Sequence, residues 1–131
     1  MRTKDSWEKA LLCAQAALDK KAYDLVILEI GEFTTIAEYF VVCTGRSDIQ
    51  VQAIGRAIEE ALAQAKMKPL AIEGFTHGQW VLIDCADVII HVLYESAREF
   101  YNIEGLWGQA PRRELPEPYN AQAQHLRLAT A

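Results

Sequence analysis

The sequence has few cysteines, and their spacing excludes two kinds of small-domain scaffold. Its 131 residues include Cys13, Cys43 and Cys85, which are far apart and form no C-x-x-C pair. An odd number of widely spaced cysteines predicts neither a disulfide framework nor a zinc site. Because free thiols persist in a reducing compartment, we expect a cytoplasmic protein.

Long apolar runs are also absent. The first 21 residues carry charges throughout, including Asp5 and Glu8, and no window approaches the roughly 20 apolar residues that cross a bilayer. The segment also lacks the apolar core and small-residue cleavage site of an export signal. We therefore expect neither export nor a membrane partner.

Net positive charge is absent as well. The chain has 13 basic and 18 acidic side chains, which gives a formal net charge of −5 at pH 7. Because this charge repels phosphate backbones, we expect no strong direct binding to nucleic acid. A basic protein is the more natural partner.

The apolar residues that are present recur with the periods of alternating helices and strands. A helix is expected over about residues 6–20, with Ser6 as its N-cap, and a second from Asp48 to about Ala65. Strands are expected at 23–30, 39–44 and 69–74, followed by a hairpin at 80–94. The pattern predicts an α/β fold with five strands.

A last helix and a polar segment follow the hairpin. Ser96 and Glu99 have the spacing of a capping box, and Gly105 is placed to end the helix. From residue 109 the chain has three prolines and little apolar periodicity. We expect one domain over residues 1–108 and a flexible C-terminal tail over residues 109–131.

The segment YFVVCTGRSDIQ, residues 39–50, raises the question of an active site, because it runs from a strand through a glycine into a helix. A phosphate loop would have several glycines and a lysine, whereas this segment has one glycine and Arg46. Ser47 and Gln50 form a capping box that explains the turn. Cys43 lies inside an apolar strand with no histidine near it in sequence, which favours packing over nucleophilic catalysis.

The predicted hairpin has two unlike faces if Ala86 and Asp87 form its turn. One face is wholly apolar and should be the core side: Val81, Ile83, Cys85, Val88, Ile90 and Val92. The other mixes apolar residues with an acid and a histidine: Trp80, Leu82, Asp84, Ile89, His91 and Leu93.

Two interpretations of this mixed face stay open. A tryptophan surrounded by charged groups is typical of the centre of a protein interface. Alternatively, Trp80 packs under the last helix and His91 hydrogen-bonds Asp84. A metal site made by Asp84, Asp87 and His91 is disfavoured, because one hairpin supplies too few convergent ligands.

Four segments, taken in order, resemble the ribosomal silencing factor (Iojap) family over roughly residues 6–108: DLVILEI, EYFVVCTGRSDIQVQAI, QWVLIDCADVIIHVL and SAREFYNIEGLW. The resemblance implies an α/β fold with a mixed five-stranded sheet flanked by helices, similar to a nucleotidyltransferase core without its catalytic residues. It also implies binding to the large ribosomal subunit through ribosomal protein fourteen of that subunit. Such binding blocks joining of the small subunit when nutrients are short, and organelle relatives act in large-subunit biogenesis.

The resemblance also implies which residues bind the partner. They are Trp80, Asp84, Asp87, His91, Arg98, Tyr101, Glu104 and Trp107, and Val88 and Leu106 match the family beside them. Two positions depart from it: Gln79 replaces an acid that many members have, and Ala86 replaces a glycine. Gln79 could weaken a polar contact to a basic partner, and Ala86 puts the two-residue turn in question, since its left-handed positions favour glycine.

Two alternative functions stay open, a catalytically active or accessory nucleotidyltransferase-fold protein and a large-subunit biogenesis factor. The enzyme would need paired metal-binding carboxylates beyond a Gly-Ser turn. Here Arg46 separates Gly45 from Ser47, and Asp84 and Asp87 straddle a turn instead. We therefore expect a non-enzyme with no cofactor, metal or small-molecule substrate.

Overall fold

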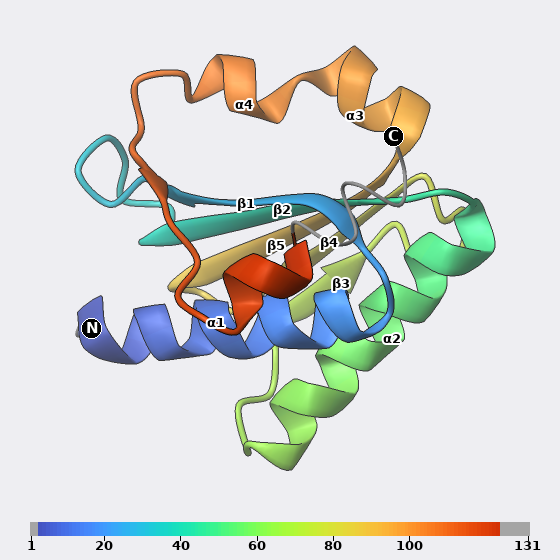
Figure 1. Ribbon diagram of the computed structural model, residues 1–131, viewed down its shortest axis with the longest axis horizontal. Helices are drawn as coiled ribbons and strands as arrows, with labels where there is room; N and C mark the ends of the chain where they lie inside the picture. The colour runs from blue at the N-terminus through green and yellow to red at the C-terminus, as the bar shows by residue number, and fades with distance from the viewer. Residues whose placement is uncertain (1–2, 124–131) are drawn as a thin grey trace.

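The computed structural model describes residues 3–123, in which a sheet lies between two layers of helices (Figure 1). The elements in chain order are α1 (Thr3–Asp19), β1 (Tyr23–Glu29), β2 (Tyr39–Gly45), α2 (Asp48–Gln64), β3 (Ala71–Glu73), β4 (Trp80–Asp84), β5 (Val88–Tyr94), α3 (Glu95–Tyr101), α4 (Ile103–Leu106) and β6 (Arg112–Arg113). Helices α1 and α2 cover one face of the sheet, and α3 and α4 cover the other. No helix within residues 3–123 is long and apolar enough to span a membrane.

The sheet has six strands in the order β3-β4-β5-β2-β1-β6. Strands β2 and β5 are parallel and every other neighbouring pair is antiparallel, which confirms a mixed α/β sheet. The sixth strand was not predicted. It is the pair Arg112–Arg113, which joins the edge of β1 and has no apolar alternation by which a strand could be recognised.

The β4–β5 hairpin has the predicted register. Trp80 lies opposite Leu93, Leu82 opposite His91, and Asp84 opposite Ile89. The N–H of Cys85 donates to the carbonyl of Val88 over 2.9 Å, which closes the predicted two-residue turn. Ala86 adopts a φ of +71°, so the turn keeps the left-handed geometry that glycine would favour.

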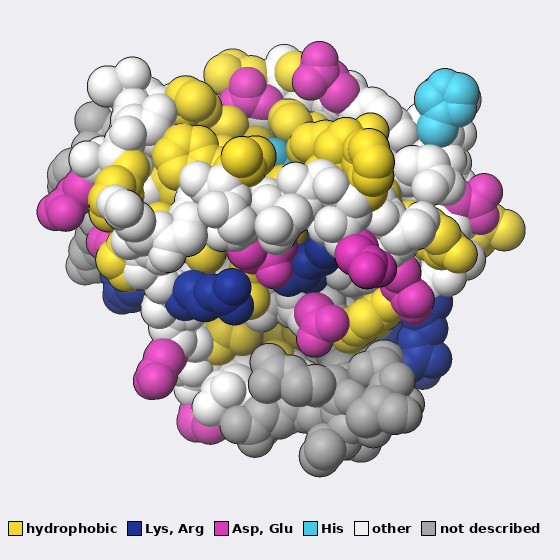
Figure 2. Space-filling view, turned by 90° about the horizontal axis from the view of Figure 1, so that it is seen from above, with side chains coloured by type: hydrophobic (Ala, Val, Ile, Leu, Met, Phe, Trp, Pro, Cys, Tyr) yellow, Lys and Arg dark blue, Asp and Glu magenta, His cyan; other side chains and the backbone are white. Residues whose placement is uncertain are grey.

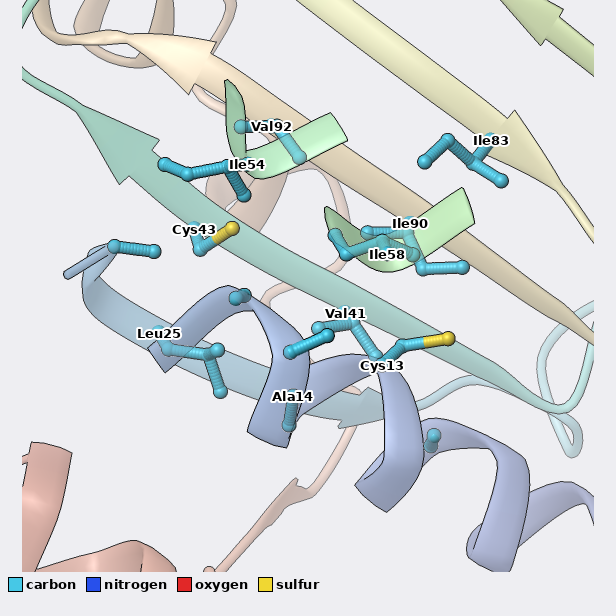
Figure 3. Close-up of a cluster of buried hydrophobic side chains, with 14 of the residues drawn as sticks. Cys13, Ala14, Leu25, Val41, Cys43, Ile54, Ile58, Ile83, Ile90 and Val92 are labelled. Atoms are coloured by element: carbon cyan, nitrogen blue, oxygen red, sulfur yellow. The ribbon is translucent and has the colours of Figure 1, made fainter. Parts of the chain in front are cut away.

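The larger core lies between the sheet and the layer of α1 and α2 (Figure 3). All seven residues of β2 are buried, as expected for a central strand. The thiols of Cys13 and Cys43 lie among apolar side chains from α1, α2, β2 and β5. Burial raises the pKa of Cys43 to about 12, so this thiol acts as a small apolar group, as the sequence predicted.

The start of α2 confirms its predicted cap. Ser47 is the N-cap, and its Oγ accepts a hydrogen bond from the N–H of Gln50 over 3.1 Å. The side-chain carbonyl of Gln50 accepts from the N–H of Arg46 over 2.6 Å. These bonds account for the turn and for the polar groups at this helix end.

Two other helix ends were predicted incorrectly. Helix α1 begins at Thr3, so Ser6 lies inside the helix at the end of its first turn and is fully buried. Helix α3 begins at Glu95 without a side-chain cap, so Ser96 does not cap it. It ends at Tyr101. The next residue, Asn102, is left-handed with a φ of +47°, and its side chain accepts a hydrogen bond from the N–H of Gly105 at the start of α4.

The segment after α4 also differs from the prediction. Residues 109–131 were expected to form a flexible tail outside the domain, yet Arg112 and Arg113 pair with β1. Leu115, Tyr119 and Ala123 then pack against the α1–α2 core. The packed structure therefore extends beyond residue 108 to at least residue 123, because sparse apolar side chains are enough to hold a segment against an existing surface. The rest of the predicted tail lies outside the described residues.

Candidate functional site

The mixed face of the hairpin lies under α3 and α4, where Trp80 and His91 meet. The indole Nε1–H of Trp80 donates a hydrogen bond to Nδ1 of His91 over 3.1 Å. Trp80 is half-buried, whereas His91 is 5% exposed. Of the predicted alternative, the packing of Trp80 against the last helix is present, since its ring contacts that of Tyr101. The predicted bond between His91 and Asp84 is wrong, because His91 bonds Trp80 and Oδ1 of Asp84 accepts from the N–H of Ala86.

Aromatic rings continue from this pair to both helices. Toward α3, the ring centroids of Trp80 and Tyr101 are 4.6 Å apart, and those of Tyr101 and Phe100 are 5.0 Å apart. Toward α4, the ring centroids of His91 and Phe40 are 4.6 Å apart, and those of Phe40 and Trp107 are 5.5 Å apart. We call these six side chains the aromatic row: Phe100, Tyr101, Trp80, His91, Phe40 and Trp107.

The aromatic row reaches the surface at its α3 end, and at its other end the half-buried Trp107 adjoins the exposed Leu106. Phe100 is 80% exposed and Tyr101 is 47% exposed on α3, while Leu106 on α4 is 79% exposed. Phe33 is also exposed and lines a shallow hollow with Leu106 and Trp107. Figure 2 shows apolar side chains gathered on this face. We call Phe33, Phe100, Tyr101, Leu106 and Trp107 the α3–α4 surface.

The sequence did not single out Phe33 and Phe100, and matched Leu106 only through the resemblance. A signal for Phe100 was present, since it adjoins Tyr101 and two neighbouring residues of a helix cannot both face the sheet. The exposure of Phe33 depends on how a loop folds back beside α4, which the sequence alone does not specify. Exposed large apolar groups that cluster in this way mark interaction sites on soluble proteins.

Arg98 and Glu104 form an ion pair beside the aromatic row. The guanidinium Nε and Nη2 of Arg98 lie 3.2 and 2.8 Å from the two carboxylate oxygens of Glu104, and Nη1 donates to Oγ1 of Thr44 over 2.8 Å. Burial alone would raise the pKa of Glu104, but the Arg98 hydrogen bonds outweigh it and hold that pKa below its usual value. The pair ties α3, α4 and β2 together.

An open cavity of about 950 Å³ borders this ion pair at the carboxyl ends of β2 and β5. Arginine and acidic side chains line it together, including Arg46, Arg112, Glu95 and Glu99. Opposite charges at the same rim do not select a phosphate or any other ligand of one charge. The cavity therefore gives no support to a phosphate-binding site at Arg46, which the sequence also disfavoured.

Asp87 lies apart from the other predicted site residues. Its side chain is 2% exposed and faces α1, where Ser6 Oγ donates to it over 2.8 Å and Lys9 Nζ over 2.6 Å. Asp84 remains half-buried beside the turn. The structure thus brings together Trp80, His91, Tyr101 and Trp107, places Arg98 and Glu104 next to them, and separates Asp87.

The titratable side chains of the hairpin lie on different sides of the sheet. No group of three or more histidine, cysteine or acidic side chains within residues 3–123 is placed to hold a metal ion. Burial raises the pKa of Cys85 to about 11. Asp87 faces α1, whereas His91 packs against Phe40 and Trp80 on the other side of the sheet. What this side of the sheet presents to solvent is the group of exposed apolar side chains of the α3–α4 surface.

Comparison with known proteins gives a consistent result. Residues 3–130 match the sequence model of the family described as "Ribosomal silencing factor during starvation". A ribosomal silencing factor from Bacillus subtilis is 40% identical over 104 residues, which cover 79% of this chain and 88% of that protein. A crystal structure from Bacillus halodurans matches with a TM-score of 0.75 and 35% identity, covering 83% of this chain and 99% of that one. Another, from Chromobacterium violaceum, matches with a TM-score of 0.75 and 30% identity, covering 92% and 98%.

Proposed function

Because the chain belongs to the ribosomal silencing factor family, we propose that it binds the large ribosomal subunit through ribosomal protein fourteen of that subunit. Bound there, it blocks association with the small subunit and represses translation when nutrients are limiting. The protein acts in the cytoplasm, where it occupies the joining surface of the large subunit without carrying out a reaction.

The observation that carries this proposal is the aromatic row and its exposed end on α3. Tryptophan and tyrosine are enriched among the residues that dominate binding energy, because they bury a large area at little cost in side-chain entropy. Trp80 and Tyr101 form such a pair, with Phe100 next to them at 80% exposure. An exposed aromatic group of this kind costs solubility unless a partner covers it.

Charge supports a basic partner. The chain has a net charge of −5, and complementary charge speeds association and selects partners. Two acids are on the same side of the sheet as the α3–α4 surface: Asp84 is half-buried on the mixed face of the hairpin, and Glu104 on α4 is paired with Arg98. Asp87 is not available to such a partner, since its carboxylate is buried against α1.

Alanine substitutions of exposed residues test the proposal without disturbing the core. Phe100→Ala and Leu106→Ala should each weaken binding to purified large subunits about tenfold, because side chains at an interface centre contribute about 1–2 kcal/mol. Binding is measured by co-sedimentation with large subunits, and folding by thermal melting. The melting temperature should change little, since both side chains are at least 79% exposed.

Two matched controls are available on other surfaces. Ile49 and Leu70 are 72% and 73% exposed, and neither lies on α3 or α4. Ile49→Ala and Leu70→Ala should bind large subunits as the unmodified chain does. If all four variants bind equally well, the α3–α4 surface is not the contact. Loss of binding only in the two controls would show that the large subunit contacts another face of the protein.

A further inference from the structure

His91 is buried beside Trp80 and Phe40 in the aromatic row and has a single polar contact among the described residues. Its Nδ1 accepts the hydrogen bond from Trp80, so the neutral ring carries its proton on Nε2. Nε2 is buried and has no hydrogen-bond partner among residues 3–123. Burial lowers the pKa of His91 to about 4, which keeps the ring neutral and its Nδ1 able to accept at neutral pH.

The register of the hairpin creates this contact. His91 lies opposite Leu82, one ladder step of two residues away from the Trp80–Leu93 pair. The two side chains are therefore diagonal neighbours on one face, within reach of aromatic side chains. Phe40 packs its ring edge-on to the imidazole at 4.6 Å, which restricts the rotation of His91.

Trp80 connects the buried His91 to the exposed residues of α3. Its ring stands between the imidazole, at 5.8 Å, and the ring of Tyr101, at 4.6 Å. An indole has few low-energy orientations, and a hydrogen bond at Nε1 selects among them. The orientation of Trp80 in turn supports the place of Tyr101 on α3.

We propose that His91 is a positioning residue for partner binding: its Nδ1 fixes the Trp80 indole in the orientation that the partner recognises, and His91 does not touch the partner itself. This inference rests on the proposed function, since it assumes that the surface containing Trp80 and Tyr101 binds the large subunit. It replaces the expectation that His91 is a direct contact. A buried side chain can then control affinity through the preorganisation of an exposed one.

Three substitutions of His91 separate positioning from packing. In His91→Asn the amide oxygen can take the place of Nδ1 and accept from Trp80. In His91→Gln the longer side chain carries its amide toward the place of Nε2, and His91→Leu removes the acceptor. Asparagine and glutamine are similar in polarity, so they differ here mainly in where the acceptor lies.

The direct measurement is the indole N–H resonance of Trp80 in a ¹H–¹⁵N spectrum, assigned with Trp80→Phe. Loss of a hydrogen bond moves this resonance, whereas a general loss of stability does not. We expect it to stay in place in His91→Asn and to move in His91→Gln and His91→Leu. Affinity for purified large subunits is measured on the same samples, at a temperature where melting curves show each variant to be folded.

Affinity should follow the resonance. His91→Asn should bind within about threefold of the unmodified chain, and the other two about tenfold more weakly, the effect of one hydrogen bond of ordinary strength. Folded His91→Leu with a shifted resonance but full affinity would overturn positioning and leave the proposed function intact. An equal loss of affinity for large subunits in His91→Asn and His91→Leu would also overturn the positioning role of His91. If the unmodified chain fails to bind large subunits, the proposed function fails and this inference fails with it.

Discussion

Asp87 is 4% exposed at the hairpin turn and joins that turn to α1 through two side chains. Burial alone would raise its pKa, but hydrogen bonds from Lys9 and Ser6 outweigh the burial and hold the pKa below its ordinary value of 3.8. The carboxylate is thus stabilised in its charged form. A residue of this kind contributes to folding, because removing one partner leaves the other charge buried and unpaired.

We predict that Asp87→Ala lowers the free energy of unfolding by about 3 kcal/mol at neutral pH, the usual effect of breaking a buried ion pair. The pH dependence has a definite sign. Because the folded-state pKa is depressed, this contribution is complete well above pH 3.8 and is lost as the pH falls through the folded-state value. Urea unfolding of the unmodified chain and of Asp87→Asn should therefore show a stability difference that narrows in acid.

An exposed ion pair provides the control for this prediction. Glu29 and Arg113 lie 3.5 Å apart with side chains 34% and 38% exposed. Glu29→Ala should change the free energy of unfolding by less than about 1 kcal/mol, because water screens such pairs. A loss in Asp87→Ala no larger than that in Glu29→Ala would show that the Asp87 contacts do not stabilise the fold.

The hairpin is the element that the sequence predicted best. Its two faces follow from the alternation of apolar residues, and its register follows from the two-residue turn at Ala86 and Asp87, so all the information is local. The role of Asp87 could not be predicted, since its partners Ser6 and Lys9 lie about 80 residues away in sequence. The same limit applies to β6, which is a strand only because the edge of β1 accepts it.

The helices that carry the candidate site show a mixed outcome. The resemblance named Trp80, His91, Tyr101 and Trp107, and the structure brings them into one row. It did not predict that Asn102 would divide the last helix into α3 and α4, because asparagine adopts a left-handed φ only where the surrounding chain permits it. That division places Leu106 on the exposed face.

Two of the three predicted N-caps, Ser47 and Ser96, allow a test at the scale of the element. We predict that Ser47→Ala lowers the free energy of unfolding by about 1 kcal/mol, the usual effect of losing an N-cap hydrogen bond. Ser96→Ala should change it by less than about 0.5 kcal/mol, because Ser96 is exposed and α3 has no side-chain cap. Chemical denaturation of both variants gives the comparison. A larger effect at Ser96 than at Ser47 would contradict the assigned caps.

In the molecule as a whole, the larger hydrophobic core and the candidate binding surface lie on opposite sides of the sheet. Helices α1 and α2 lie on one side of the sheet and α3 and α4 on the other (Figure 1). The larger core packs against α1 and α2, whereas the aromatic row joins the other face of the sheet to α3 and α4. Substitutions at the exposed end of the row remove few buried contacts. This arrangement allows a surface rich in exposed aromatic residues without weakening the main core, and it makes binding and folding separable by measurement.

A factor that works by occupying a surface should act in proportion to the number of surfaces. We predict that, with large subunits well above the dissociation constant, the loss of joined ribosomes rises linearly with added protein and levels off at one chain per large subunit. Binding should also weaken with salt, because the Debye length falls from about 10 Å at 0.1 M to about 3 Å at 1 M and screens an acidic chain from a basic partner. Sedimentation of subunits over a titration and a salt series measures both effects. Inhibition by far less than one chain per subunit would instead require turnover, and affinity independent of salt would exclude attraction between opposite charges as the source of binding.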